Sequence, residues 1–338
     1  MEWRILYLDQ RDVDALGAQD MAAALTDVEN AMSLGEKGDA IHPIKGVMEW
    51  DPDRYGPANR INSMPGYLGG SYQMAGIKWI GSNPQNVANG FPRASALTIL
   101  NDPETKLPLC ILDGTAISAV RTGASGGVGI RYLAKETAQT LVLIGAGAQS
   151  RTQLEAAALV RPSLKQCYVA DILPERAAAF ARDMTGTVSF PVQAVPMEAL
   201  KDYCQRADII ISATVSATPI LDADWLNPGV LYIQIGGYEC TYDAVWKADK
   251  RVVDEWLHVI HRKATTIAFL YADGLLHDAD VYADLGEICN GKKPGRENDQ
   301  EIIYYNPVGM GNEDIAIATR LYRKAKAEGV GLWLNYWY

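Results

Sequence analysis

The sequence predicts an α/β protein of two domains, one built on a doubly wound parallel sheet and the other on an antiparallel sheet. From residue 141 onward, apolar runs alternate with helical segments, which is typical of a parallel sheet. Between residues 41 and 112, short alternating strands are divided by Pro and Gly, which favours an antiparallel sheet. The 338 residues also exceed one typical domain, so two hydrophobic cores are expected.

The N-terminal part begins with an apolar strand up to Leu8, followed by helices over residues 12–20 and 21–35. The antiparallel strands that follow are expected at residues 46–50, 59–65, 76–80, 95–100 and 108–112. The Asx- and Pro-rich segment 101–106 predicts a hairpin turn between the last two. Residues 116–133 then form one or two helices rich in small side chains.

A nucleotide-phosphate motif follows the first strand of the parallel sheet. The buried-strand run 141–144 breaks into Gly145-Ala-Gly147-Ala148-Gln149-Ser150, where a helix begins. Gly145 permits a tight turn, Gly147 lets backbone N–H groups approach a pyrophosphate, and the helix directs its positive end at the same anion. This pattern predicts a Rossmann domain.

An acidic residue at the expected distance favours NAD as the cofactor. Asp171 ends the next strand, about 20 residues beyond the motif, where a carboxylate binds the adenosine ribose. The alternative is an ordinary strand-turn-helix with two glycines. We expect a helix at 174–184 and further strands at 188–195, 207–213, 229–235 and 250–254. The helix 314–328 and the aromatic tail 331–338 are expected to fold back onto the N-terminal domain, because an unpaired apolar strand would be an exposed edge.

Composition excludes several classes of protein. No apolar run approaches the ~20 residues that cross a bilayer, and the start of the chain lacks the features of a signal peptide, so we expect a cytoplasmic protein without membrane association. The formal net charge of −10 argues against nucleic-acid binding. The five cysteines are scattered, which suggests neither disulfides nor structural zinc, and the four histidines show no metal-ligand spacing.

Three cationic side chains are candidates for binding a substrate carboxylate. Arg60 is in an alternating strand, Lys78 lies between Ile77 and Trp79, and Arg121 is in a small-residue segment. Arginine binds a carboxylate with a planar fork, whereas lysine offers a compact charge that can also donate a proton. The alternative is that each faces solvent. An anionic substrate would need such a basic pocket in this acidic chain.

Glu239 is a candidate acid, since it follows the strand 229–235 and ligands bind at the carboxyl ends of such strands. The alternative is a capping acid. Asp314 fits the N-cap of the final helix.

The chain resembles the ornithine cyclodeaminase/mu-crystallin family over essentially its whole length. The resemblance rests on Arg60-Ile with Met64-Pro, Gly76-Ile-Lys-Trp, Arg121-Thr-Gly-Ala, Gly145-Ala-Gly-Ala-Gln-Ser and Val308-Gly-Met-Gly-Asn-Glu-Asp314. Within the family, Arg93-Ala-Ser, Leu100-Asn-Asp-Pro-Glu-Thr, Ala283-Asp-Leu-Gly and Pro294-Gly-Arg-Glu are similar to dehydrogenases that make L-2,3-diaminopropionate for siderophore biosynthesis.

The resemblance implies a homodimer with a substrate-binding and dimerisation domain at 1–125 with 307–338, and a NAD-binding Rossmann domain at 126–306. It implies substrate contacts from Arg60, Met64, Lys78 and Arg121, and catalytic roles for Lys78, Arg121 and Glu239. The cofactor contacts expected are Thr122, Gly145, Gly147, Ala148, Gln149, Ser150, Asp171, Ala213, Thr214, Gly309, Met310 and Gly311. The segment formed by the last three resembles the stretch near the nicotinamide, where the absent side chains of its glycines would allow close approach. No metal is implied.

The implied reaction is NAD-dependent oxidative cleavage of N-(2-amino-2-carboxyethyl)-L-glutamate to 2-oxoglutarate and L-2,3-diaminopropionate through an imine. Two alternatives stay open. One is another NAD-linked reaction of the family on an amino acid or imine: ornithine cyclodeaminase, alanine or opine-type dehydrogenase, or ketimine reductase. Glu239 follows Gly236-Gly237-Tyr238, where the cyclodeaminases have an aspartate, and this weakens the assignment of ornithine cyclisation. The other alternative is a binding protein of the mu-crystallin kind.

Overall fold

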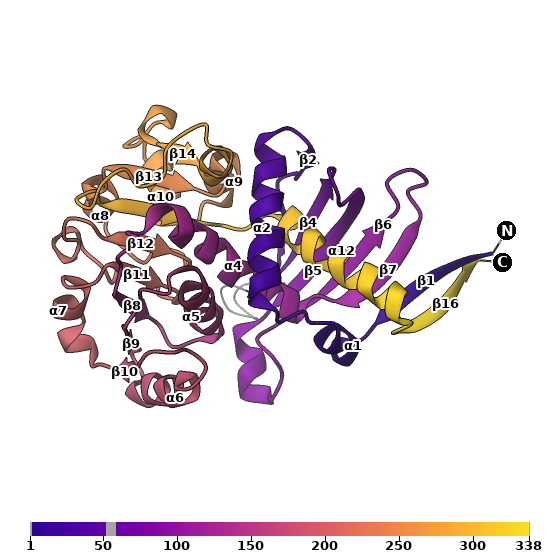
Figure 1. Ribbon diagram of the computed structural model, residues 1–338, viewed down its shortest axis with the longest axis horizontal. Coiled ribbons are helices and arrows are strands. Elements are labelled where there is room, and N and C mark those ends of the chain that lie inside the picture. Colours follow the sequence, from indigo (N-terminus) through magenta and orange to yellow (C-terminus); the bar gives the residue numbers. More distant parts are fainter. Residues whose placement is uncertain (1, 52–58, 338) are drawn as a thin grey trace. The chain divides into compact units, whose positions relative to one another are not determined.

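The computed structural model describes residues 2–51 and 59–337, and its chain divides into two compact units (Figure 1). Unit 1 combines residues 1–121 with residues 310–338, and unit 2 comprises residues 122–309. The chain passes from one unit to the other inside helix α4 (Thr115–Leu133) and again after Gly309. The α/β fold predicted from the sequence is confirmed.

Unit 1 is built on a mixed sheet with the order β16-β1-β7-β6-β5-β4-β2, to which β3 adds by pairing with β4. Strands β4 to β7 pair with one another in antiparallel fashion, as expected, whereas β1 runs parallel to β7. The predicted hairpin at 101–106 joins β6 to β7. The strands are β1 (Trp3–Leu8), β2 (Ala40–Ile41), β3 (Gly46–Glu49), β4 (Arg60–Leu68), β5 (Met74–Ser82), β6 (Ala94–Asn101), β7 (Pro108–Asp113) and β16 (Leu332–Trp337).

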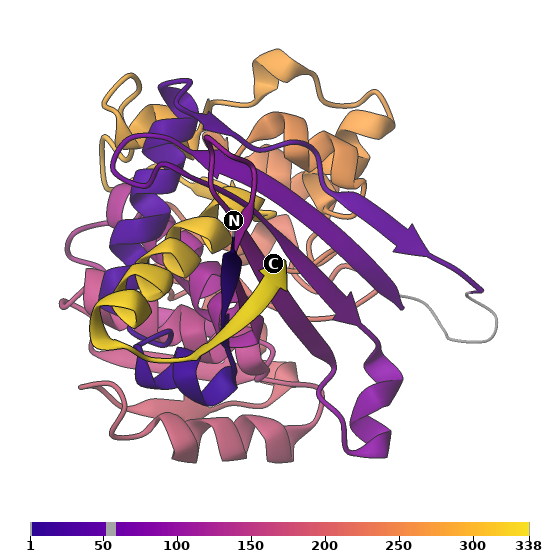
Figure 2. The same ribbon diagram turned by 90° about the vertical axis from the view of Figure 1, so that its right-hand side faces the viewer.

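Helices α2 (Met21–Glu36) and α12 (Gly311–Glu328) lie side by side over one face of this sheet (Figures 1 and 2). The side chain of Asp20 caps α2 by accepting from Ala23 N–H at 3.1 Å. The first nine residues of α12 are buried. A Cβ on Gly311 would lie 2.5 Å from the Met64 carbonyl oxygen, so only glycine lets this helix approach β4 so closely.

The final strand β16 pairs with β1, so the prediction that the last helix and the tail fold back onto the N-terminal part is confirmed.

The predicted limits of two helices were wrong. The first helix, α1 (Gln10–Ala15), ends five residues early because Gly17 adopts a positive φ of 89° and turns the chain. Helix α12 begins three residues early, at Gly311, which changes the place of Asp314.

Unit 2 contains a sheet in which every pair of neighbouring strands is parallel, with the order β10-β9-β8-β11-β12-β15-β13-β14. The strands are β8 (Thr140–Ile144), β9 (Gln166–Ala170), β10 (Val192–Ala194), β11 (Ile209–Ser212), β12 (Leu231–Gln234), β13 (Lys250–Val253), β14 (Ala283–Asp284) and β15 (Ile303–Asn306). The order of the strands changes direction at β8, because β9 and β10 follow on one side of it and β11 and β12 on the other. This is the doubly wound arrangement.

Helices flank this sheet: α5 (Ala148–Val160), α6 (Pro174–Met184), α7 (Leu200–Cys204), α8 (Tyr242–Lys247), α9 (Trp256–Arg262), α10 (Thr266–Ala272) and α11 (Leu285–Cys289). The predicted strand 188–195 is only three residues long, because Pro191 has no N–H for a ladder and the strand begins after it. Strand β15 was missed, although its four residues are buried between β12 and β13.

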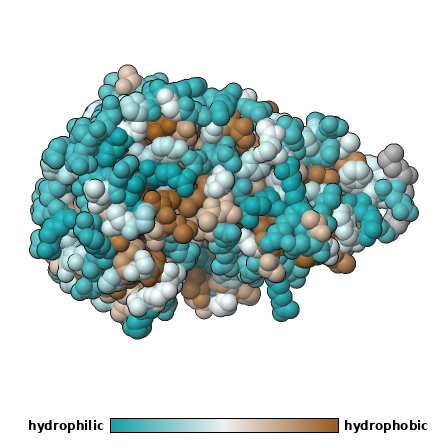
Figure 3. Space-filling model, in the orientation of Figure 1, coloured by the Kyte–Doolittle hydropathy of each residue, from teal (hydrophilic) through white to brown (hydrophobic). Residues whose placement is uncertain are grey.

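The described helices include none long and apolar enough to cross a membrane. On the face shown in Figure 3, hydrophilic residues predominate and hydrophobic ones form separate patches. The five cysteines are free, and four of them are buried.

Candidate functional site

The glycine motif of unit 2 forms the predicted turn between β8 and α5. Gly145 has a φ of +98°, and a Cβ there would lie 2.9 Å from the carbonyl oxygen of Ala213. Gly147 is the N-cap of α5, and a Cβ on it would meet no atom within 4 Å, so the space above the turn is open. No side chain caps the first turn of α5. The turn therefore presents helix N–H groups and free space to an anion.

The third motif residue, Ser150, contributes a bond that glycine or alanine lacks. Its side chain is buried and the hydroxyl donates to the Gly145 carbonyl at 2.5 Å. This bond joins the two ends of the turn. Among the other predicted cofactor residues, Ala148 begins α5, Gln149 lies in its first turn, and the Thr122 carbonyl accepts from Gln153 at 2.8 Å.

Asp171 lies at the carboxyl end of β9 and contacts the glycine turn directly. Its carboxylate accepts from the N–H of Ala146 at 2.9 Å and from that of Leu173 at 3.0 Å. The acid is thus fixed beside the turn, at the place where a Rossmann carboxylate binds a ribose.

Replacing Asp171 with alanine is expected to weaken NAD binding by about ten- to a hundredfold, since a charged hydrogen bond contributes about 1.5–3 kcal/mol. Discrimination against NADP should fall as well, because a carboxylate repels the 2′-phosphate. Fluorescence titration with NADH and NADPH measures both effects. Asp183→Ala is the control, because Asp183 is an exposed acid of α6 that pairs with Arg151 at 2.6 Å. Unchanged cofactor preference would show that Asp171 does not bind the ribose.

Glu239 is buried and binds two loops at the carboxyl ends of β11 and β12. One carboxylate oxygen accepts from Thr214 N–H at 2.5 Å, and the other accepts from Ser212 Oγ and Gly236 N–H, each at 2.8 Å. Burial raises the pKa of Glu239, and these donors oppose that shift. The contacts give Glu239 a structural role, and its catalytic role stays a prediction.

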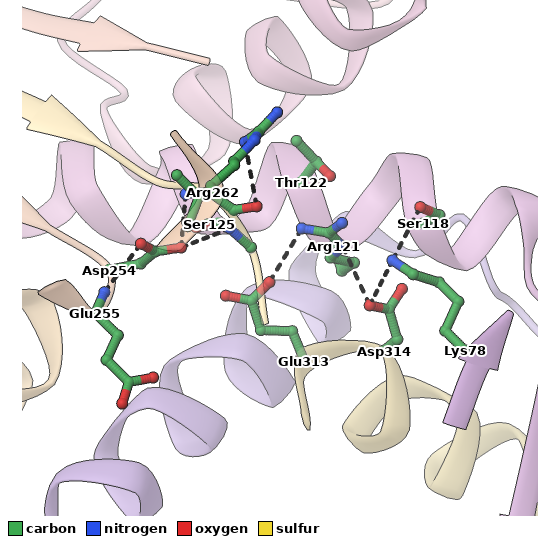
Figure 4. Close-up of polar contacts among 12 residues, drawn as sticks. Lys78, Ser118, Arg121, Thr122, Ser125, Asp254, Glu255, Arg262, Glu313 and Asp314 are labelled. Atoms are coloured by element: carbon green, nitrogen blue, oxygen red, sulfur yellow. Dashed lines mark hydrogen bonds and ion pairs between the residues drawn. The ribbon is translucent and has the colours of Figure 1, made fainter. Parts of the chain in front are cut away.

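Asp254, predicted only as the end of a strand, binds the segment in which the chain leaves unit 2. Its buried carboxylate accepts from the N–H groups of Val308 and Gly309 at 2.7 and 2.6 Å (Figure 4). Gly309 has a positive φ of 77°. The segment expected to border the nicotinamide is therefore fixed from within unit 2. In unit 1, Met310 is buried, and Gly311 is required for contact with β4.

The cations Lys78 and Arg121 come together in unit 1 with two acids from α12 (Figure 4). Lys78 Nζ lies 2.7 Å from Asp314 Oδ2 and donates to Ser118 Oγ at 3.3 Å. Arg121 Nη1 lies 3.2 Å from Glu313 Oε2, and Arg121 Nε lies 3.4 Å from Asp314 Oδ2. The solvent-facing alternative for Lys78 is excluded, since its side chain is 1% exposed.

Burial lowers the pKa of Lys78 and the charge of Arg121 lowers it as well, whereas Asp314 and Glu313 oppose both effects; the resulting pKa is about 8. Both acids are fully buried and lie in the first turn of α12, where the helix dipole favours negative charge. With all four groups ionised the cluster is neutral. It therefore has balanced buried charge and two cations able to bind a carboxylate.

The expectation that Asp314 caps the final helix was wrong. The N-cap is Met310, no side chain caps the helix, and the Asp314 carboxylate turns to Lys78 and Arg121. Sequence reasoning also missed Glu313 and Ser118. The cluster has Met64 at its edge, because Met64 on β4 pairs with Lys78 on β5. Arg60 is not part of it: this side chain is one-third exposed and lies 3.7 Å from Glu49.

The profile of the ornithine cyclodeaminase/mu-crystallin family matches residues 8–329. The chain belongs to this family. It is 32% identical to N-((2S)-2-amino-2-carboxyethyl)-L-glutamate dehydrogenase of Staphylococcus aureus, over 99% of each chain. Among solved structures, Δ(1)-pyrroline-2-carboxylate reductase of Thermococcus litoralis, in complex with NADH and L-proline, is 32% identical with a TM-score of 0.89, over 97% of this chain and 99% of that one. An archaeal alanine dehydrogenase dimer with bound NAD is 30% identical with a TM-score of 0.88, over 99% and 100%.

The chain is thus an NAD(P)-dependent oxidoreductase of the ornithine cyclodeaminase/mu-crystallin family. The glycine turn fits the dinucleotide, because it has an open cradle at Gly147, an uncapped helix N-terminus and a fixed carboxylate at Asp171.

Proposed function

We propose that the protein catalyses NAD-dependent oxidative cleavage of N-(2-amino-2-carboxyethyl)-L-glutamate to 2-oxoglutarate and L-2,3-diaminopropionate. The observation that carries the proposal is the buried Lys78–Arg121 pair together with a third cation on the same face of the sheet. The full-length likeness to the staphylococcal dehydrogenase supports the same substrate.

The third cation, Arg60, suits a long substrate with several carboxylates. Arg60 and Met64 are four residues apart on β4, so their side chains leave the same face, and Met64 pairs with Lys78. At about 3.3 Å per residue, the backbone of Arg60 is about 13 Å from that of Met64. A tricarboxylate can use cations at both places, whereas alanine or proline has a single carboxylate.

In the proposed reaction, NAD⁺ would supply the hydride acceptor when bound, so that the bond between the glutamate α-carbon and nitrogen is oxidised to an imine. Water adds to the imine carbon, the C–N bond breaks, and 2-oxoglutarate and the amine of L-2,3-diaminopropionate are released. Residues of the glycine turn, Asp171 and the loop at Thr214 would hold the cofactor. Arg121 and Lys78 bind carboxylate oxygens, and the Lys78 ammonium is a proton donor to the leaving nitrogen.

This role requires the protonated form of Lys78, whose pKa is lowered to about 8. We therefore expect kcat/KM to be flat below that pH and to fall about tenfold for each further pH unit above it. Initial rates between pH 6.5 and 10 measure the profile, with NAD⁺ saturating. A rate that rises above pH 8 would mean that neutral Lys78 acts as a base.

The direct test offers the purified protein NAD⁺ with N-(2-amino-2-carboxyethyl)-L-glutamate and follows NADH absorbance. Parallel reactions contain L-ornithine, L-alanine, L-proline or L-glutamate. NADH formation with the first compound alone, together with 2-oxoglutarate, supports the proposal. Turnover of a simpler amino acid without turnover of the first compound would overturn it.

The second candidate is another reaction of the family at a carbon–nitrogen bond of an amino acid or imine. It is favoured by the likeness to pyrroline-2-carboxylate reductase and alanine dehydrogenase, which is as extensive as that to the staphylococcal enzyme. The parallel substrates above distinguish these candidates.

We also propose a homodimer that forms through the uncovered face of the unit 1 sheet. Three large apolar side chains on this sheet, Tyr7, Trp79 and Leu97, are 38%, 40% and 45% exposed. Trp79 and Leu97 are direct partners on β5 and β6, so they form one continuous patch. The alanine dehydrogenase relative is a dimer. Sedimentation should give about twice the 36.9 kDa of one chain, and a monomer would contradict the proposal.

A further inference from the structure

We propose that Asp314 is a positioning residue that holds Lys78 and Arg121 side by side and keeps Lys78 protonated. A single oxygen, Oδ2, lies 2.7 Å from Lys78 Nζ and 3.4 Å from Arg121 Nε. Two buried cations repel each other strongly in a medium of low dielectric constant. A shared carboxylate oxygen therefore permits the pair to exist in the folded protein.

The groups packed around Lys78 leave Asp314 as its principal counter-ion. On the neighbouring strands, the residues paired with Lys78 are the uncharged Met64 and Thr98. From α4 come the Ser118 hydroxyl and the opposing charge of Arg121, and from α12 come Asp314 and Glu313. Glu313 lies 3.2 Å from Arg121, so Asp314 provides the direct contact that favours the ammonium form.

The geometry also fixes where the ammonium group can act. Lys78 Nζ has three N–H donors, and within the described part of the chain it contacts Asp314 and Ser118. The third N–H has no hydrogen-bond partner among the described residues, and under the proposed function it is the one that reaches the substrate. Asp314 Oδ1 is buried and has no hydrogen-bond partner among the described residues. The carboxylate therefore contacts both cations through its other oxygen, Oδ2.

The kinetic consequence rests on the proposed function, whereas the protonation state of Lys78 can be measured without a substrate. Lysine labelled with ¹³C and ¹⁵N gives a side-chain NMR signal for Lys78, identified by its absence in Lys78→Met. Its titration midpoint is compared in the wild-type protein, Asp314→Asn and Asp27→Asn. Asp27 is the control because this buried acid forms an ion pair at 2.7 Å with Arg320, a partly exposed residue of α12.

In Asp314→Asn we expect the Lys78 midpoint to fall by about one pH unit or more, because an opposite charge within 4 Å has an effect of that size. The alkaline limb of kcat/KM should move by the same amount, and Asp27→Asn should move neither. If Asp314→Asn does not fold, Asp314→Glu is measured in its place. This variant keeps the negative charge but displaces it, so we expect it to fold and to shift the Lys78 midpoint by a smaller amount.

A Lys78 midpoint unchanged in Asp314→Asn, or in Asp314→Glu if the first variant does not fold, would overturn the proposal. A shifted midpoint in a protein that does not turn over N-(2-amino-2-carboxyethyl)-L-glutamate would support the role of Asp314 and overturn the proposed function alone.

Discussion

Replacing Lys78 with methionine is expected to reduce turnover by about 10³-fold, within the range that positioned proton donors and charges contribute to catalysis. Methionine keeps an unbranched apolar chain in the buried position but has no ammonium group. The variant therefore loses the contact with Asp314 and the N–H that reaches the substrate under the proposed function. NAD binding should be nearly unchanged, because the glycine turn and Asp171 belong to unit 2, whereas Lys78 belongs to unit 1.

NADH formation under saturating NAD⁺ measures the loss of turnover, and fluorescence titration measures cofactor binding. Lys37→Met is the matched control, since Lys37 is an exposed lysine of unit 1 whose ammonium group donates to Ser33 Oγ at 3.0 Å. The assigned role would be refuted by wild-type turnover in Lys78→Met. An equal loss of NAD affinity would instead point to a disturbed fold or a cofactor contact.

Local features of this chain were predictable because they depend on neighbouring residues. The turn at Gly145 and the hairpin at 101–106 follow from short-range backbone geometry, and the structure contains both. Strand β15 was missed for the opposite reason. Its four residues follow a long irregular segment, and their place between β12 and β13 depends on partners far away in sequence.

The chemistry of the candidate site was only partly predictable. An alternating strand cannot reveal which face is buried, so Lys78 could be named as a candidate but not placed. Its main partner, Asp314, is 236 residues away in sequence. Only the packing of α12 on β4 and β5, which the glycine at 311 allows, brings the two together. A three-residue error at the start of that helix was enough to assign Asp314 to a cap.

Replacing Arg121 with methionine is expected to lower the free energy of unfolding by about 3–5 kcal/mol, the usual cost of removing one partner from a buried ion pair. Arg121 contacts two fully buried acids, Glu313 and Asp314, and its loss leaves their charge compensated by Lys78 alone. Turnover should also fall, since the variant has lost one half of the carboxylate clamp. Urea denaturation followed by circular dichroism measures the stability change.

A second variant separates the structural role of Arg121 from its role in binding. Arg121→Met combined with Glu313→Gln removes one positive and one negative charge, so the remaining Lys78–Asp314 pair is neutral again. Stability should recover by about half or more, because uncharged residues of similar volume replace buried ion pairs at little cost. Turnover should stay low, since no guanidinium group is restored. Recovery of turnover together with stability would mean that Arg121 supports the fold without binding substrate.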